Sequence, residues 1–183
     1  ESKAAQTKTG GAAVVVPFAP HPVEVIAPEQ APRLLTDTPH KLQILARDRE
    51  IRQVLLVRFD QAFAALSGEE FIGSLIDAAP AGGIARICVG RGWRFGRGRS
   101  GDVALLKRLG AAHGFAVSGI DLVEVGGQRV SSTRIREAVA TGDFATAALL
   151  LGRPYRVHGA VTMGRQLGRT IGFPTANLAV KRE

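Results

Sequence analysis

The chain has few of the features that mark a secreted scaffold or a membrane protein. It contains 183 residues but a single cysteine, Cys88, so no disulfide can form within it. Its longest apolar runs, such as Ala12–Val16 and Ala145–Leu151, are far shorter than the roughly 20 residues that span a bilayer. No basic segment followed by an apolar one opens the chain, so no secretory signal is expected. We therefore expect a cytoplasmic protein without a membrane-spanning segment.

Two catalytic signatures are also missing. No Gly-x-Ser-x-Gly marks a serine nucleophile. His40, His113 and His158 show no metal-ligand spacing with one another or with Cys88, so no zinc site is expected. Cys88 lies in an apolar Ile-Cys-Val run, which predicts a small buried residue rather than a reactive thiol.

Acidic residues are scarce. The chain has 16 Asp and Glu against 24 Lys and Arg, a net charge of +8. This excess favours an anionic partner, which can be nucleic acid, acidic lipid or a phosphorylated small molecule. The charge is concentrated: Arg153–Glu183 holds six basic residues and one acidic residue, a net charge of +5, and Arg91–Arg99 is a second dense segment.

The rest of the chain alternates between strand-like and helix-like patterns. Strands are predicted at Ala12–Phe18 (buried on both faces), Gln53–Phe59, Ile84–Gly90 and Phe115–Leu122. Helices are predicted from Thr38, from the capping box Ser67–Glu70, over Asp102–His113, over Thr133–Ala140 and from Asp143 to Leu151. The prolines at 17, 20 and 22 predict an extended loop around His21. Such alternation predicts an α/β fold with a parallel sheet, which binds ligands at the carboxyl ends of its strands.

The alternation ends after Gly152-Arg153-Pro154. Tyr155–Thr162 instead has the period of an antiparallel strand. The 31 residues from 153 to 183 are too few for an independent core. We therefore predict a domain boundary near Gly152, with residues 1–152 as one domain and residues 153–183 as the beginning of a β domain.

The segment Arg129–Arg136 places Ser131, Ser132 and Thr133 at the start of a predicted helix. Free N–H groups, the positive end of a helix dipole and flanking arginines together suit a polyphosphate. Ordinary capping by Ser131 or Ser132, with the arginines on a solvated face, explains the same residues. The pattern alone leaves both interpretations open.

The segment Arg91–Arg99 interleaves arginine and glycine with Trp93 and Phe95. Aromatic rings that stack on bases and arginines that hold phosphates are typical of nucleic-acid binders, and they equally suit one flavin or adenine ring with its phosphates. A flexible surface loop with its rings tucked beneath it is the third interpretation. No Gly-Lys-Ser/Thr follows, so it is not a P-loop, and we do not interpret it as a dinucleotide fingerprint.

Two shorter motifs contain proline. Pro20-His21-Pro22 fixes an imidazole on a stiff loop, where a histidine hydrogen-bonded within a turn is an equally good interpretation. Gly172–Asn177 combines a glycine that permits close approach, a stiff turn, and hydroxyl and amide oxygens of the kind that Mg²⁺ and phosphate accept. A β-turn with Asn177 as its polar residue explains that segment too.

Taken together, these segments resemble the bifunctional bacterial riboflavin kinase/FMN adenylyltransferases, also called FAD synthetases. The resemblance covers nearly the whole chain in family order and is most specific in its last two motifs. The matching stretches are Pro17–Pro22, Lys41–Leu45, Val57–Asp60, Arg94–Asp102, Val130–Arg136 and Gly168–Leu178.

The resemblance implies an α/β fold: a Rossmann-like nucleotidyltransferase domain with a parallel sheet, then the start of an antiparallel β-barrel riboflavin kinase domain. It implies phosphorylation of riboflavin by ATP to FMN, and adenylylation of FMN to FAD with release of pyrophosphate, with Mg²⁺ as cofactor. The expected partners are ATP, riboflavin and FMN, with no nucleic acid and no membrane. The oligomeric state is not predicted.

The resemblance also implies roles for individual residues. Those expected to hold the ATP phosphates are Ser132, Thr133 and Arg136, with Arg129 beside them. Those expected near the flavin and its phosphate are His21, Pro20, Pro22, Arg94, Phe95 and Gly96. Those expected at the kinase site are Gly168, Arg169, Gly172 and Pro174, with Thr175 and Asn177 serving Mg-ATP.

The chain departs from the family pattern at its ends and at one loop position. The family's N-terminal Gly-x-Phe-Asp-Gly-Val-His-x-Gly-His motif and the kinase's glutamate base are not in this sequence, so we expect this piece to bind its ligands but turn over poorly. Gly92-Trp93 stands where the family usually has Asn or Asp followed by Phe. The alternatives are a catalytically inactive flavin- or nucleotide-binding homologue, and an RNA- or DNA-binding module that uses the Arg/Gly/aromatic loop.

Overall fold

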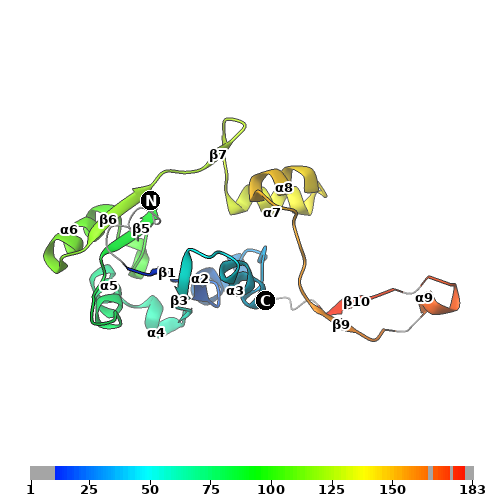
Figure 1. The fold of residues 1–183 in the computed structure, drawn as a ribbon, viewed down its shortest axis with the longest axis horizontal. Helices are drawn as coiled ribbons and strands as arrows, with labels where there is room; N and C mark the ends of the chain where they lie inside the picture. The colour runs from blue at the N-terminus through cyan, green and yellow to red at the C-terminus, as the bar shows by residue number, and fades with distance from the viewer. Residues whose placement is uncertain (1–10, 165–166, 174, 180–183) are drawn as a thin grey trace. The chain divides into compact units, whose positions relative to one another are not determined.

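The computed structural model describes residues 11–164, 167–173 and 175–179, and the chain divides into two compact units (Figure 1). The first unit consists of the chain up to Pro32 and of Leu45–Val123, and the second of Arg33–Ile44 together with the chain from Glu124 onward. Within the described residues, no helix combines the length and the apolar character needed to cross a membrane. The predicted boundary near Gly152 stays a prediction.

The elements of the first unit alternate between strands and helices. In chain order they are β1 (Ala13–Val15), β2 (Phe18–Ala19), α2 (Pro22–Ile26), the 3-10 turn η1 (Pro28–Gln30), β3 (Ile51–Val54), β4 (Val57–Arg58), α4 (Gln61–Ala64), α5 (Gly68–Asp77), β5 (Arg86–Gly90), the 3-10 turn η2 (Arg97–Arg99), α6 (Val103–His113) and β6 (Ala116–Ile120). Helix α3 (Thr38–Ala46) begins in the second unit and ends in the first.

The strands of the first unit pair in parallel, as the alternation predicts. β1 pairs with β3, β2 with β4, and β5 with β6 in an unbroken register from Arg86↔Ala116 to Gly90↔Ile120. The parallel α/β class is therefore confirmed. Among the described residues these ladders are separate two-stranded sheets rather than one continuous sheet.

The predicted strand Ala12–Phe18, buried on both faces, is wrong in extent and in burial. It is split into β1 and β2, and Val14 is 46% exposed. Pro17 lies in the break and has no N–H to donate, although its carbonyl still accepts from the N–H of Val57 at 2.9 Å. Proline thus interrupts the ladder without ending the parallel course of the chain.

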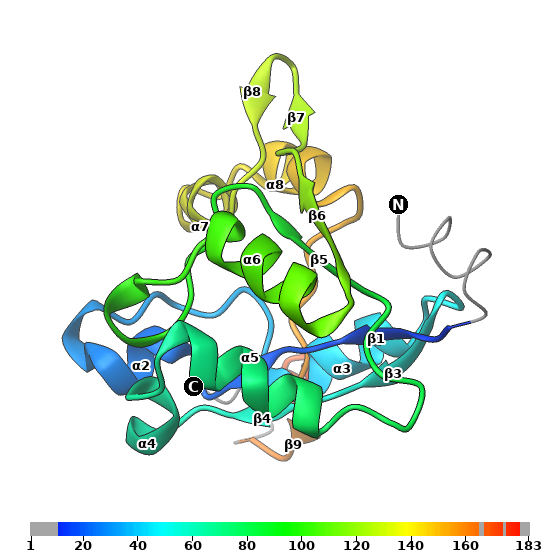
Figure 2. The same ribbon diagram turned by 90° about the vertical axis from the view of Figure 1, so that its left-hand side faces the viewer.

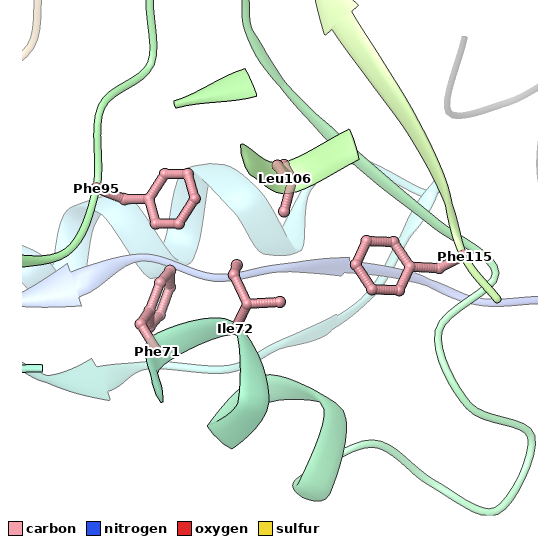
Figure 3. Close-up of a cluster of buried hydrophobic side chains, with 5 residues drawn as sticks. All are labelled: Phe71, Ile72, Phe95, Leu106 and Phe115. Atoms are coloured by element: carbon pink, nitrogen blue, oxygen red, sulfur yellow. The ribbon is translucent and has the colours of Figure 1, made fainter. Parts of the chain in front are cut away.

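A cluster of five buried side chains forms the core of the first unit (Figure 3). Its members are Phe71, Ile72, Phe95, Leu106 and Phe115. They come from α5, α6 and the segments next to β5 and β6, and α6 lies along β6 with α5 beside it (Figure 2). The core is therefore built on one face of the β5–β6 pair.

Cys88 corrects a prediction. It is exposed, whereas Ile87 and Val89 on either side of it pack against the core. Successive side chains of a strand point to opposite faces, so an apolar run in a strand covered on one face leaves every second residue outside. The Ile-Cys-Val run gave no sign of which face was covered.

The helix ends follow local capping chemistry. Ser67 and Glu70 form both hydrogen bonds of the predicted capping box, and Asp102 caps α6, which ends at Gly114. Two expectations need correction. Asp37, not Thr38, caps α3, since its Oδ1 accepts from the N–H of His40 at 2.8 Å. The segment around His21 is not an extended loop, because α2 begins at Pro22, where a proline at the first helical position is favourable.

The second unit contains two packed helices and two small antiparallel ladders (Figure 1). Besides the start of α3 its elements are β7 (Glu124–Val125), β8 (Gln128–Arg129), α7 (Ser132–Ala140), α8 (Phe144–Leu151), β9 (Ala160–Thr162), α9 (Leu167–Thr170) and β10 (Asn177–Ala179). The expected turn at Gly126-Gly127 joins β7 to β8. β9 pairs antiparallel with β10, so an antiparallel β segment does follow the α/β part, although its first strand begins at Ala160 rather than at Tyr155.

Candidate nucleotide and flavin sites

The start of α7 presents two hydroxyls and the N–H groups of a helix terminus. Ser131 is the cap: its Oγ accepts from the N–H of Arg134 at 3.3 Å. Ser132 and Thr133 follow as exposed residues of the first turn. Because Ser131 does the capping, the hydroxyls of Ser132 and Thr133 are left for an anion at the positive end of the helix dipole.

The three arginines around this helix start are used in three different ways. Arg134 donates from Nη1 to the carbonyl of Arg129 and from Nη2 to Oε1 of Gln128, both at 2.6 Å. Arg136 donates from Nε to the carbonyl of Arg33 at 2.7 Å, which leaves its terminal nitrogens for another acceptor. Within the described part of the second unit, no hydrogen bond or ion pair engages the side chain of Arg129.

The structure therefore brings Arg129, Ser132, Thr133 and Arg136 to one short segment, in which Arg136 is only partly engaged by the protein. The bond from Arg136 to Arg33 joins residues 103 positions apart, and nothing in the local sequence could have indicated it. Arg134 was grouped with the flanking arginines from sequence, but its contacts are made within the protein.

His21 lies at the N-terminus of α2, directly after β2. Its Nδ1 accepts from the N–H of Val23 at 3.3 Å, and Pro20 and Pro22 flank it. The bond assigns the acceptor role to Nδ1, so the imidazole caps the helix in the manner of a histidine held within a turn. In the neutral ring this places the proton on Nε2, which makes that nitrogen a hydrogen-bond donor.

The aromatic rings of the Arg91–Arg99 loop are packed inward. Phe95 is buried in the core cluster beside Phe71 (Figure 3), and Trp93 stacks on Phe95 with a centroid separation of 4.4 Å and an interplanar angle of 21°. The loop closes through paired bonds between Phe95 and Gly101, whose N–H groups reach each other's carbonyls at 3.1 and 2.8 Å. For Phe95, the structure matches the third interpretation of this segment, a surface loop with its rings tucked beneath it.

Two arginines of this loop are paired with carboxylates. Arg91 forms a two-pronged ion pair with Asp121, and Arg94 Nη1 lies 3.1 Å from Oδ2 of Asp102. The N–H of Leu105, and next the positive charge of Arg94, hold the pKa of Asp102 below its ordinary value. Asp102 thus caps α6 and orients Arg94 at once, a double role that sequence reasoning missed.

One pattern in the loop also escaped the sequence interpretation. Gly96–Gly101 has the letters Gly-x-Gly-x-x-Gly and lies between β5 and α6, as a dinucleotide fingerprint does. In that fingerprint the first glycine makes the tight turn out of the strand, and the third lets helix and strand pack closely. Here β5 ends six positions earlier, at Gly90, and Gly101 lies against the ring of Phe95, where an added Cβ would come within 2.7 Å of it. The glycines close the loop instead.

A cavity of about 380 Å³ lies beside this loop, at the starts of α5 and α6. It is lined by Glu69, Ser100, Asp102, Ala104, Leu105 and Arg108. Two of these lining residues form an ion pair, with Arg108 Nη2 and Glu69 Oε1 3.2 Å apart. None of the site residues proposed from sequence lines this cavity.

The C-terminal motif forms a short helix and a turn before β10. Gly168 is buried, and its carbonyl accepts from the N–H of Phe173 at 2.8 Å. A Cβ on Gly168 would lie 3.1 Å from Oγ1 of Thr175, so the glycine admits that threonine. Gly172 has a left-handed φ of 81° in the turn. Pro174 and the side chain of Arg169 lie outside the described residues.

Thr175 and Asn177 are exposed; Thr175 precedes β10 with its side chain beside Gly168, and Asn177 begins β10 with its amide beside Gly164. A hydroxyl and an amide carbonyl are oxygen donors that suit a hard cation such as Mg²⁺. The donor types therefore fit the expected Mg-ATP role.

A histidine pair in the second unit was not anticipated. The rings of His40 and His158 stack with centroids 5.4 Å apart, and His158 Nδ1 lies 3.8 Å from Oδ2 of Asp37. Together they attach the chain before β9 to α3. The residues are 118 positions apart, and no local signal connects them.

The FAD synthetase family model matches residues 1–134, and the riboflavin kinase family model matches residues 151–183. The chain belongs to the FAD synthetase family. Over 170 residues it is 42% identical to the bifunctional riboflavin kinase/FMN adenylyltransferase of Escherichia coli K12, covering 93% of this chain and 53% of that protein. It is 40% identical over 169 residues to the enzyme of the same name from Pseudomonas fluorescens, with 92% and 53% covered. The chain thus spans about half the length of the curated relatives that it matches.

A solved structure is similar in fold as well. The crystal structure of a macrolide-efflux protein from Streptococcus pneumoniae superposes with a TM-score of 0.78 at 30% sequence identity, covering 98% of this chain and 58% of that one. The family resemblance seen in the motifs, and the α/β class that it implied, are confirmed by the family matches. The roles of individual site residues stay predictions.

Proposed function

We propose that the natural protein carrying this FAD synthetase chain makes FAD in two steps. ATP first phosphorylates riboflavin to FMN, and a second ATP then adenylylates FMN to FAD with release of pyrophosphate. The observation that carries the proposal is the succession of an FAD synthetase match and a riboflavin kinase match in one chain. We further propose that it works in the cytoplasm on small molecules, with neither a nucleic acid nor a membrane as partner.

The start of α7 supports a role in binding the triphosphate of ATP. In adenylyl transfer an FMN phosphate oxygen attacks the α-phosphorus of ATP, and the bond from that phosphorus to the leaving pyrophosphate breaks. This displacement needs positioning and neutralisation of charge more than it needs a protein nucleophile. Ser132, Thr133 and the guanidinium of Arg129 supply donors there, and the terminal nitrogens of Arg136 supply more.

The flavin side of the reaction is assigned to the loop that begins after β5 and to the start of α2. The imidazole of His21, between Pro20 and Pro22, places a polar ring at that helix start, and Arg94 offers positive charge beside Asp102. Phe95 shapes the loop from within, because its ring is buried, and Gly96 lets the loop pass close to α5. In this proposal Phe95 and Gly96 act on the flavin through loop geometry.

The kinase step is assigned to the turn before β10. In this proposal the segment that lies along the nucleotide contains Gly168, Arg169, Gly172 and Pro174. Thr175 and Asn177 would hold Mg²⁺ together with ATP oxygens. The ion, when bound, neutralises charge on the phosphates. The chain's own residues offer two oxygen donors, the hydroxyl of Thr175 and the amide oxygen of Asn177.

The packing of the loop weighs against the nucleic-acid alternative. A binder of single strands needs exposed aromatic faces on which bases stack. Phe95 is 6% exposed, and Trp93 is stacked upon it. The inactive-homologue alternative rests on Gly92, which is exposed and offers no polar side chain where the family usually has Asn or Asp.

The deciding experiment supplies the natural protein with riboflavin, ATP and Mg²⁺ and resolves the flavins by chromatography. We expect FMN and then FAD to appear, with pyrophosphate released in step with FAD. Arg136→Ala should weaken ATP affinity, while Arg108→Ala, at an arginine paired with Glu69 in the first unit, serves as the matched control. Failure to form either flavin would overturn the proposal. A steep loss of oligonucleotide affinity with rising salt would instead support the nucleic-acid alternative.

A further inference from the structure

Arg134 makes contacts that differ in kind from those of its neighbours. It lies half-buried in the first turn of α7, and its side chain reaches back to β8. β8 is the last strand before that helix (Figure 2). Its two terminal nitrogens donate to two acceptors, the carbonyl of Arg129 and Oε1 of Gln128, each at 2.6 Å. Its own N–H is held by Ser131, the helix cap. One side chain thus links β8 to the start of the helix.

We propose that Arg134 is a positioning residue, which fixes Arg129 and the β7–β8 hairpin at the N-terminus of α7 so that Arg129 meets the nucleotide phosphates. The inference rests on the proposed function, in which this helix end binds the triphosphate of ATP. It separates the arginines of the segment into one that faces the anion and one that holds the first in place.

The hairpin is too small to hold its shape alone. β7 and β8 contribute two residues each, and a two-stranded hairpin is marginal in water even when it is longer. Arg129 is its final residue, so fraying of the ladder would move a guanidinium that no hydrogen bond or ion pair holds in the described part of the second unit. The two hydrogen bonds from Arg134, called the clamp below, connect both residues of β8 to a helix, which is the more rigid element.

Arginine suits this position better than lysine does. Its planar fork offers two parallel donors to two acceptors at once, whereas the ammonium of lysine is a point charge on a flexible stem. The terminal nitrogens of Arg134 are already directed at protein acceptors, so its contribution to an anion is made through the placement of Arg129. A lysine would keep the charge and lose the clamp.

The test is a double-mutant cycle in the natural protein, measuring KM for ATP and kcat for FMN adenylylation. We expect Arg134→Ala to raise KM for ATP about tenfold in the wild-type background and less than about twofold in the Arg129→Ala background, because coupled residues are non-additive. Arg134→Lys should stay close to Arg134→Ala. Arg108→Ala, which breaks an ion pair in the first unit, is the control and should leave KM unchanged.

Several outcomes would overturn the inference. Equal losses in the two backgrounds would mean that Arg134 acts independently of Arg129, and full activity in Arg134→Lys would mean that its charge alone matters. If Arg134→Ala melts at a lower temperature than wild type, Gln128→Ala removes one acceptor of the clamp and should still raise KM by about threefold, with the same coupling to Arg129. A wild-type protein that neither binds ATP nor forms FAD would count against the proposed function, not against the clamp.

Discussion

Gly96 is the position where a single added methyl group should do most damage to the Arg91–Arg99 loop. Its φ of 73° and ψ of 171° lie in a region that is essentially restricted to glycine, where another residue costs about 1–3 kcal/mol. A Cβ there would also lie 2.5 Å from the backbone nitrogen of Gly68 and 2.8 Å from its Cα. Forcing extra atoms against packed backbone typically costs about 1–3 kcal/mol more. We therefore expect Gly96→Ala to lower the free energy of unfolding by about 2–6 kcal/mol.

Two nearby glycines provide matched controls. Gly98 has a left-handed φ of 63° but no described atom within 4 Å of an added Cβ, so Gly98→Ala should cost only the conformational penalty, about 1–2 kcal/mol. Gly92 has neither a positive φ nor a described neighbour within 4 Å, so Gly92→Ala should be neutral or stabilise by up to about 1 kcal/mol. The three variants therefore separate the cost of backbone strain from the cost of a steric clash with α5.

The assay is urea unfolding followed by tryptophan fluorescence. Trp93 is the single tryptophan of the chain, and it stacks on Phe95, the residue directly before Gly96, so its emission reports this loop. The expected order of stability, from highest to lowest, is Gly92→Ala, Gly98→Ala and then Gly96→Ala. If Gly96→Ala and Gly98→Ala unfold within about 0.5 kcal/mol of each other, the close approach of the loop to α5 has no energetic weight and the reasoning is refuted.

Three further predictions test the core, a cap and a titrating group. Leu106→Ala should cost about 2–5 kcal/mol because the side chain is fully buried, whereas Leu149→Ala, at 64% exposure, should change the unfolding free energy by less than about 0.5 kcal/mol. Ser131→Ala should lose about 1 kcal/mol of stability with the cap, while Ser132→Ala should keep its thermal midpoint and lose ATP affinity. The pKa of Asp102 is lowered from 3.8 in the folded protein, so its contribution to stability is complete above that pH and is lost as the pH falls through the lower folded value. The stability difference between wild type and Asp102→Asn should therefore be constant from about pH 7 to about pH 5 and shrink below pH 3.8, and a difference that changes near pH 6 would contradict the assignment.

Helix boundaries could be predicted because the chemistry that sets them lies within a few residues. The capping box of Ser67 and Glu70, the cap of Asp102 and the cap of Asp143 each join a side chain to an N–H three positions away. The parallel pairing followed from the alternation of elements. The motifs also sufficed to identify the family, because their residues and their order along the chain can be compared without knowing which residues are in contact.

The errors share one physical cause, which is that burial depends on what covers a face. Cys88 is exposed although its neighbours on both sides are apolar, because only one face of β5 is packed against α5 and α6. Val14 is hydrophobic but exposed, because no element among the described residues covers its side chain. A run of apolar residues in the sequence does not show which face of the strand is covered by other elements.

Charge shows the same limit more sharply. The net charge of +8 counts every arginine equally, although the arginines make different contacts in the structure. Arg91 and Arg94 are paired with carboxylates, and Arg134 is a crosslink between a strand and a helix. Where no hydrogen bond or ion pair holds a guanidinium among the described residues, as at Arg129, the charge is available for the anion-binding role proposed above. The identity of the partner is thus decided by the few arginines that the fold leaves available, and at α7 they gather where a helix terminus already favours phosphate.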